Sequence, residues 1–199
     1  MTAGTSSLPP EGARRRFLVA LSQGYRAAAI DLADLLARSP AAPADALRAV
    51  ALYERAWEEG VAIAAFELGR LYETGVGHVH GATADVVPRD FAQAWYWYQK
   101  GAAIGEPSAL ARVASRAEQE AIAAGDPEKG RALLLEAFRR YAAAVARAEF
   151  EGWPETALQR WRHRRASLAR VLARDGRMQE LADAYEQARG EALTATPAR

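Results

Sequence analysis

An internal repeat constrains the fold of this chain more than any other feature of its sequence. When Gly24, Gly60 and Gly105 are superposed, residues of matching character recur at six fixed distances from them. Upstream of each glycine stand an alanine at eleven positions, an aromatic residue at seven and a small residue at four. Downstream stand an alanine at four positions, an aliphatic residue at eight and a small residue at nine. The matching sets are Ala13/Ala49/Ala94, Phe17/Tyr53/Tyr98, Ala20/Ala56/Gly101, Ala28/Ala64/Ala109, Leu32/Leu68/Val113 and Ala33/Gly69/Ala114.

The spacing of these positions predicts a pair of helices on either side of each glycine. Residues three, four, seven and eight apart share one face of a helix, so the aromatic and small residues form a buried stripe. The glycine ends the first helix and supplies the turn into the second. Each hairpin leaves an apolar face that the next one covers, so we expect an all-α fold, a right-handed α-solenoid of antiparallel helical hairpins with about nine helices.

Composition and chain length agree with this fold. Ala, Leu, Arg and Glu dominate the 199 residues, and no segment alternates with a period of two. We expect a flexible tail at 1–8, a repeat region at 9–125, a C-terminal helical bundle or cap at 126–190 and a second flexible tail at 191–199. The fifth helix is expected to open at Pro88, and the last to end near Arg189.

Four segments around the second and third glycines resemble a known family. They are Phe66-Glu67-Leu68-Gly69-Arg70-Leu71-Tyr72, Gly75-Val76-Gly77, Pro88-Arg89-Asp90 and Ala94-Trp95-Tyr96-Trp97-Tyr98-Gln99-Lys100-Gly101-Ala102. Together they are similar to a Sel1-like repeat, which is related to the TPR and forms α-solenoids. The complete unit covers 60–105 and departs from the family in an insertion at 78–86. The resemblance implies an adaptor in signalling or assembly, or in bacteria a component of secretion or toxin-neutralising systems.

Charge and cysteine content exclude several function classes. A formal net charge of +1 gives no global attraction to nucleic acid or to a membrane surface. The absence of cysteine removes disulfides, thiolate nucleophiles and Cys-ligated zinc, and fits a reducing cytosol. The apolar run 17–21 is too short for a signal peptide or a membrane span. We therefore expect a cytoplasmic protein, and its Ala/Arg-rich composition suggests a bacterial source. Nothing in the sequence indicates an oligomeric state.

The sequence offers no recognisable catalytic constellation. It has no Gly-rich phosphate loop with Lys, no Gly-x-Ser-x-Gly and no His-x-x-x-His on a helix. His78 and His80 could bind a metal together with Asp85 and Asp90, but two residues apart in an extended loop they point to opposite sides. We expect no enzyme activity, cofactor or metal, and assign His78, His80 and Asp85 to a partner contact on the inserted loop.

A protein or peptide partner is the favoured ligand, with no nucleic acid and no membrane. We expect the second helix of each pair (25–38, 61–74 and 107–124) to line the concave face of the solenoid. That face would expose the charged residues Asp31, Asp34, Glu67, Arg70 and Arg112. The alternative is a bacterial immunity protein, which binds and blocks a secreted effector enzyme with much higher affinity than an adaptor needs.

Two further features have an ordinary explanation beside a functional one. The run 95–98 could be an aromatic ligand box, but consecutive residues fan around a helix, so we expect Tyr98 and Trp95 in the core and Trp97 or Tyr96 against an adjacent helix. The helix at 154–174 carries a basic stripe, defined as Arg160, His163, Arg164, Arg170 and Arg174. The stripe could bind an anion or a partner. We favour internal neutralisation by the carboxylates of the next helix, Glu180, Asp183 and Glu186.

Overall fold

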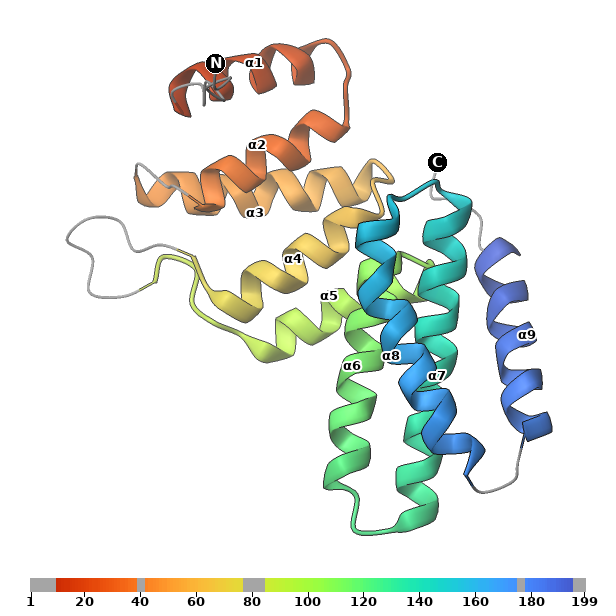
Figure 1. The fold of residues 1–199 in the computed structure, drawn as a ribbon. Helices are drawn as coiled ribbons and strands as arrows, with labels where there is room; N and C mark the ends of the chain where they lie inside the picture. Colours follow the sequence, from red (N-terminus) through yellow and green to blue (C-terminus); the bar gives the residue numbers. More distant parts are fainter. Residues whose placement is uncertain (1–9, 39–41, 77–84, 175–177, 195–199) are drawn as a thin grey trace, which may run out of the picture. The chain divides into compact units, whose positions relative to one another are not determined.

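In the computed structural model, residues 10–38, 42–76, 85–174 and 178–194 are described, and their regular structure is helical apart from one isolated β-bridge (Figure 1). The all-α prediction and the expected number of helices are confirmed for these ranges. The helices are α1 (Pro10–Ser22), α2 (Ala27–Arg38), α3 (Pro43–Glu58), α4 (Ile63–Thr74), α5 (Phe91–Ala103), α6 (Pro107–Ala123), α7 (Pro127–Phe150), α8 (Glu155–Ala173) and α9 (Met178–Thr194).

The three aligned glycines form the same turn. Gly24, Gly60 and Gly105 have φ angles of 86°, 85° and 81°, in the left-handed region that favours glycine. In each turn the residue after the glycine donates its N–H to the carbonyl oxygen four positions before the glycine, over 2.8 to 3.1 Å. This hydrogen bond closes a helix C-terminus by satisfying a carbonyl that the helix leaves unpaired. A fourth copy occurs at Gly152 (φ 74°), where Trp153 N–H donates to the Ala148 carbonyl, and joins α7 to α8.

The repeated positions are buried as their spacing predicts. The aromatic residues Tyr53 and Tyr98 are buried, as are all the small and aliphatic positions downstream of the three glycines. In the first copy, the upstream residues Ala13, Phe17 and Ala20 are only half-buried. They lie on α1, which packs on α2 and has no earlier described helix to cover its other side.

The described residues up to Trp95 belong to a first compact unit, in which α1 packs on α2, α2 on α3 and α3 on α4 (Figure 1). Alanines at the contacts let the helices approach closely: Ala29, Ala56 and Ala64 form one buried cluster. Partly buried Leu21, Ile30, Trp57 and Val61 pack against it.

The fifth helix begins at Phe91, three residues later than predicted. Val76 and Val87 exchange both backbone hydrogen bonds, 2.9 and 2.8 Å long, so the chain is still extended as it reaches Pro88. The Asp90 carboxylate then accepts hydrogen bonds from the N–H groups of Ala92 and Gln93, which caps the new helix. A capping carboxylate therefore decides the start of α5, rather than the proline.

The aromatic run of α5 differs from the prediction at one residue. Tyr98 is buried as expected, but Trp97 is the buried tryptophan, whereas Trp95 is only half-buried and Tyr96 is exposed. Lys100 Nζ lies 4.7 Å from the Tyr96 ring centroid and 5.2 Å from that of Trp97, a cation–π arrangement that covers the outer side of both rings.

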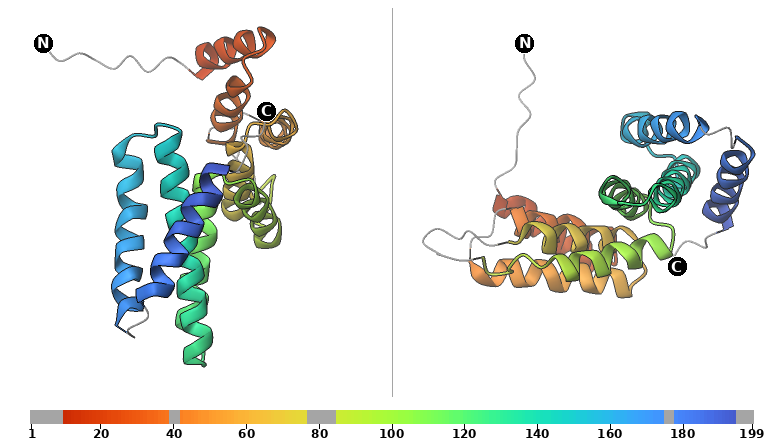
Figure 2. Two further views of the ribbon diagram at one scale, coloured as in Figure 1. Left: turned by 90° about the vertical axis from the view of Figure 1, so that its right-hand side faces the viewer. Right: turned by 90° about the horizontal axis from the view of Figure 1, so that it is seen from below.

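Tyr96 begins the second compact unit, which is built around α7. Helices α6, α8 and α9 all pack on α7, and the end-on view in Figure 2 shows α7 between them. The hairpin expected between α8 and α9 is only weakly packed, because α9 turns its small residues Ala184, Ala188 and Ala192 toward the core and makes most of its contacts with α7. It continues past Arg189 to Thr194.

Candidate interaction surface

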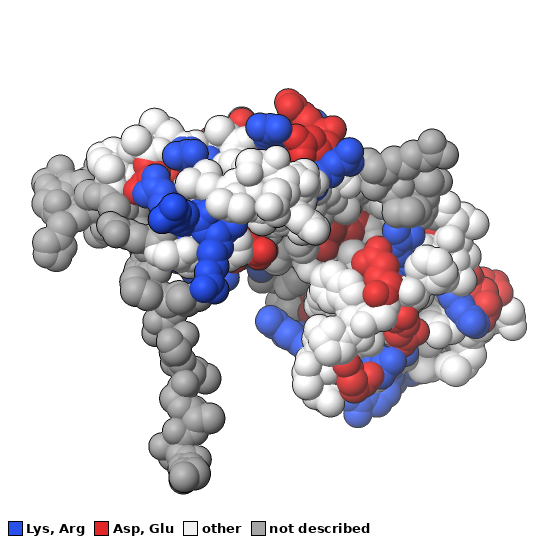
Figure 3. Space-filling view, turned by 90° about the horizontal axis from the view of Figure 1, so that it is seen from above, with Lys and Arg blue, Asp and Glu red and all other residues white. Residues whose placement is uncertain are grey.

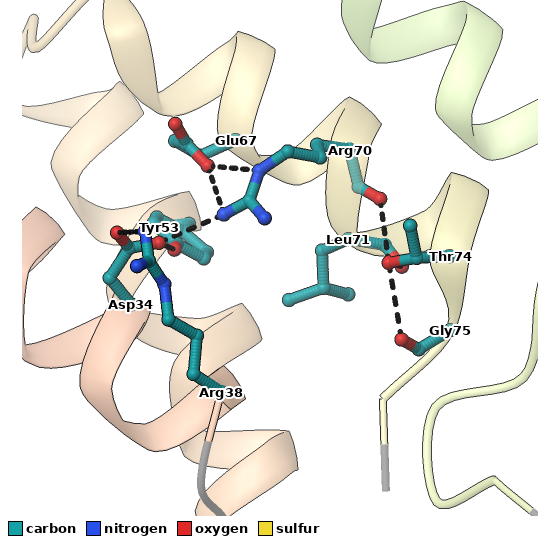
Figure 4. Close-up of polar contacts among 8 residues, drawn as sticks. All are labelled: Asp34, Arg38, Tyr53, Glu67, Arg70, Leu71, Thr74 and Gly75. Carbon is teal, nitrogen blue, oxygen red and sulfur yellow. Dashed lines mark hydrogen bonds and ion pairs between the residues drawn. The ribbon is translucent and has the colours of Figure 1, made fainter.

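Four polar side chains from three helices of the first unit form a connected cluster, which we call the α2–α4 cluster (Figure 4). Asp34 of α2 accepts a hydrogen bond of 2.7 Å from the Tyr53 hydroxyl of α3. The same carboxylate oxygen pairs with Arg70 Nη2 of α4 at 2.9 Å. Arg70 also donates from Nε to Glu67 at 2.7 Å, one turn earlier on α4. Arg38 pairs with the second oxygen of Asp34 at 2.7 Å and extends the cluster to the surface.

Burial and charge fix the ionisation states in this cluster. Burial, the hydrogen bond to Asp34 and the Asp34 charge all raise the pKa of Tyr53, so its hydroxyl stays protonated and remains a donor. Burial lowers the pKa of Arg70, but the hydrogen bond to Glu67 and the charges of Glu67 and Asp34 outweigh it and raise the pKa. Tyr53 is therefore a neutral donor in this cluster, and Arg70 a charged one.

The α2–α4 cluster is open to solvent on one side. The Arg70 side chain is 39% exposed, against 26% for Asp34 and 15% for Glu67. Two carboxylates and two guanidinium groups balance one another once Arg38 is included. Charged groups held in this way can pair with opposite charges of a ligand.

The structure brings three of the five residues predicted for the concave face into direct contact. Asp34, Glu67 and Arg70 meet although 33 positions separate the first two in the sequence. Asp31 lies one turn before Asp34 on α2 and is exposed. Arg112 belongs to α6 in the second unit, where its guanidinium lies 5.5 Å from the Tyr98 ring centroid.

Sequence reasoning missed the part that Tyr53 takes in this cluster. The repeat assigns Tyr53 to the core, and its ring is fully buried there. A buried tyrosine hydroxyl needs a hydrogen-bond partner, so its presence at a core position signalled a nearby acceptor. The period of the repeat does not say which acceptor, because Asp34 lies on another helix.

The inserted loop is described only at its base. His78 and His80 lie outside the described residues. Asp85 is half-buried beside Gly75, where a Cβ added to the glycine would come within 2.7 Å of the Asp85 Oδ2 atom. The Arg89 Nε donates to the Thr74 carbonyl over 3.0 Å and joins the two sides of the base.

The carboxylates of α9 do not neutralise the basic stripe of α8 in the way we expected. Glu180 pairs with Arg131 of α7 at 3.0 Å, and Asp183 accepts a hydrogen bond from Gln179 of its own helix. The stripe residue with a counter-charge in the described part of the chain is Arg164, which pairs at 3.4 Å with Glu118 of α6. The expected pairing is wrong for Glu180 because α9 packs on α7.

One face of the described residues carries charged side chains of both signs (Figure 3). On the face drawn in Figure 3, small groups of Lys and Arg lie beside small groups of Asp and Glu. Within the described ranges, no group of three His, Asp or Glu side chains is placed to hold a metal ion. None of the helices in those ranges combines the length and the apolar character needed to cross a membrane.

No protein-family model matches this sequence, and a search of the curated proteins found no match. The similarity to Sel1-like repeats therefore rests on the motif residues of 60–105 and on the repeated turn.

Proposed function

We propose that this protein is a scaffold or adaptor that binds another protein or a peptide through the α2–α4 cluster and the exposed residues around it. The observation that carries this proposal is the contact between Asp34 and Arg70, which joins the second helices of two successive hairpins. The contact holds charged groups of both helices in one fixed arrangement, and a preorganised surface loses less entropy when it binds.

Two further features support a binding role. The cluster is tied to the fully buried Tyr53, so its polar atoms are held by the core rather than by flexible surface side chains. Asp31 and Arg38 extend the same part of α2 into solvent, where they can pair with charges of a partner. The inserted loop begins at Gly75, directly after α4, and is a second place where this partner could make contact.

The proposal is tested by charge reversal at the exposed positions of this surface. The tagged full-length protein is expressed in its own host, and co-purifying proteins are compared between the wild type, the Asp31→Arg/Arg38→Glu variant and a control. The control, Arg48→Glu/Glu58→Arg, makes the same two reversals at exposed positions of α3.

A protein that co-purifies with the wild type and the control, but not with the α2 variant, is the expected result. Equal recovery with all three, or recovery of the protein alone, refutes the proposal. The affinity of the recovered complex then separates two roles: micromolar binding fits an adaptor, and nanomolar or tighter binding fits the immunity alternative.

A further inference from the structure

The exposed side of α8 is basic from Arg160 to the end of the helix. At 100° per residue, the basic stripe falls on one arc together with Thr156, Gln159 and Ser167. The buried residues Leu158, Leu168 and Leu172 lie on the opposite side and face the second unit's core. Glu155 is the one acidic residue of α8; it lies at the edge of the arc and pairs with Arg162, which is not part of the stripe.

Few carboxylates of the second unit reach this arc. Arg162 pairs with Glu149 and Glu155, and the Arg165 guanidinium lies over the Tyr185 ring at 5.2 Å. Among the described residues, the stripe arginines Arg160, Arg170 and Arg174 have no ion pair. Arg160 and Arg164 stand one turn apart, as do Arg170 and Arg174, and like charges at this spacing repel.

A small hollow opens beside the end of the stripe. Its volume is about 280 Å³, and its walls include Ala121 and Ala124 of α6, Leu134 of α7, and Val171 and Leu172 of α8. Val171 belongs to both features, because it is 44% exposed and stands between the stripe arginines Arg170 and Arg174. The polar groups at the hollow are already engaged: Asp126 caps α7, and Arg131 pairs with Glu180.

We propose that the basic stripe of α8 and this hollow form a second binding surface, whose ligand is an acidic protein segment with one apolar side chain. The segment's carboxylates would pair with Arg160, Arg170 and Arg174, whose guanidinium groups suit two-pronged hydrogen bonds to carboxylates. Arg160 and Arg174 stand about 21 Å apart along the helix axis, the length of four turns of a partner helix. This proposal uses none of the residues of the α2–α4 cluster and does not depend on it.

A protein segment fits this surface better than a nucleic acid does. The exposed arc carries no aromatic side chain on which a base could stack, since Trp161 is half-buried and packs against Trp153 at 5.9 Å. The chain as a whole has a net charge of +1, so long-range attraction to a phosphate backbone is weak. The hollow beside the stripe would also hold an apolar side chain, which a phosphate backbone does not offer.

The test measures binding of fluorescent probes to the full-length protein by anisotropy at about 50 mM salt. The first probe is a helical peptide of about 16 residues with Glu on one face and a single Leu, and a matched peptide replaces Glu by Gln. The third probe is a DNA duplex of similar length. Two triple variants are compared with the wild type: Arg160→Gln/Arg170→Gln/Arg174→Gln in the stripe, and Arg15→Gln/Arg16→Gln/Arg48→Gln on α1 and α3. The control removes the same charge from exposed arginines that also have no ion pair among the described residues.

We expect the Glu peptide to bind the wild type and the control alike, and to lose about tenfold or more in affinity with the stripe variant. The Gln peptide should bind weakly to all three proteins. Replacing the peptide's Leu by Ser should lower its affinity about tenfold, the contribution of one partly buried apolar side chain.

Three results overturn the proposal: no binding of the Glu peptide to the wild type, an equal loss of affinity with both triple variants, or tighter binding of the duplex than of the peptide through the stripe. If the Ser peptide binds the wild type as tightly as the Leu peptide does, the role assigned to the hollow is wrong.

Discussion

Glu106 offers the sharpest test of the energetics of this fold. It is the N-cap of α6 and is only 3% exposed, and its carboxylate accepts hydrogen bonds from the N–H groups of Ser108 and Ala109. Burial raises its pKa from an ordinary value of 4.5 to about 7, although the two backbone hydrogen bonds lower it. The negative charge of Glu151 adds to the rise.

This pKa sets both the sign and the size of a pH effect on stability. Because the folded state binds the proton more tightly than the unfolded chain, raising the pH from the unfolded pKa to the folded one destabilises the fold. A pKa that moves from 4.5 to about 7 corresponds to about 3 kcal/mol of unfolding free energy. That stability is fully present below pH 4.5 and is lost as the pH rises through about 7.

The perturbation is Glu106→Gln, which keeps a hydrogen-bond acceptor at the cap and removes the ionisation. Urea unfolding of the wild type and the variant is measured at about pH 5 and at about pH 8, and most of the 3 kcal/mol falls between these values. We expect the difference in unfolding free energy, variant minus wild type, to rise by about 2 to 3 kcal/mol across this interval. Asp126→Asn, at the exposed N-cap of α7, is the control, and it should keep the wild-type slope in this range. The reasoning is refuted if Glu106→Gln leaves that slope unchanged, or if the NMR titration of the Glu106 carboxyl has its midpoint near 4.5.

Three more predictions concern the first unit and the repeated turn. Tyr53→Phe removes the donor to Asp34 and should lower the unfolding free energy by about 1.5 to 3 kcal/mol, and a double-mutant cycle with Asp34→Asn should assign most of this loss to the pair. Leu68→Ala opens a cavity at a fully buried position and should lower the unfolding free energy, measured with urea, by about 2 to 5 kcal/mol. Leu47→Ala, at an exposed position, should change the unfolding free energy by less than about 0.5 kcal/mol. Equal losses for the two variants would contradict the assigned core. Gly24→Ala should destabilise by about 1 to 2 kcal/mol because its φ is 86° and nothing else hinders a Cβ there. Gly190→Ala, within α9 and equally unhindered, should instead raise the melting temperature. Melting temperatures that change in the same direction for both variants would contradict the left-handed conformation assigned to Gly24.

The turns show where sequence reasoning succeeds. The three aligned glycines share one conformation because a left-handed residue at a helix end is a local requirement, visible in the sequence itself. The fourth copy of the turn, at Gly152, escaped the alignment because its flanking helices lack the aromatic and alanine positions of the repeat. The glycine turn therefore also occurs at a place in this chain where the buried positions that identified the repeat are missing.

The expected start of α5 and end of α9 were misplaced, and the other predictions that were wrong concern how one helix packs against another. Trp97 rather than Trp95 is buried, although position 97 lies outside the repeat's stripe of positions 94, 98 and 101. Glu180 pairs with Arg131 instead of with the basic stripe, because α9 lies along α7. The family resemblance, the loop contact and the identity of a partner stay predictions.

The sequence by itself determined that the chain forms these helices, which repeat positions they bury and how the turns at the three aligned glycines are built. Each of these follows from residues less than three turns apart, so helical periodicity and the φ preference of glycine are sufficient to specify them. The tertiary structure alone decided which charges meet: Asp34 with Arg70, Arg131 with Glu180, and Arg164 with Glu118. Side chains on separate helices pair according to how those helices pack, and a one-dimensional pattern of charges does not contain that information.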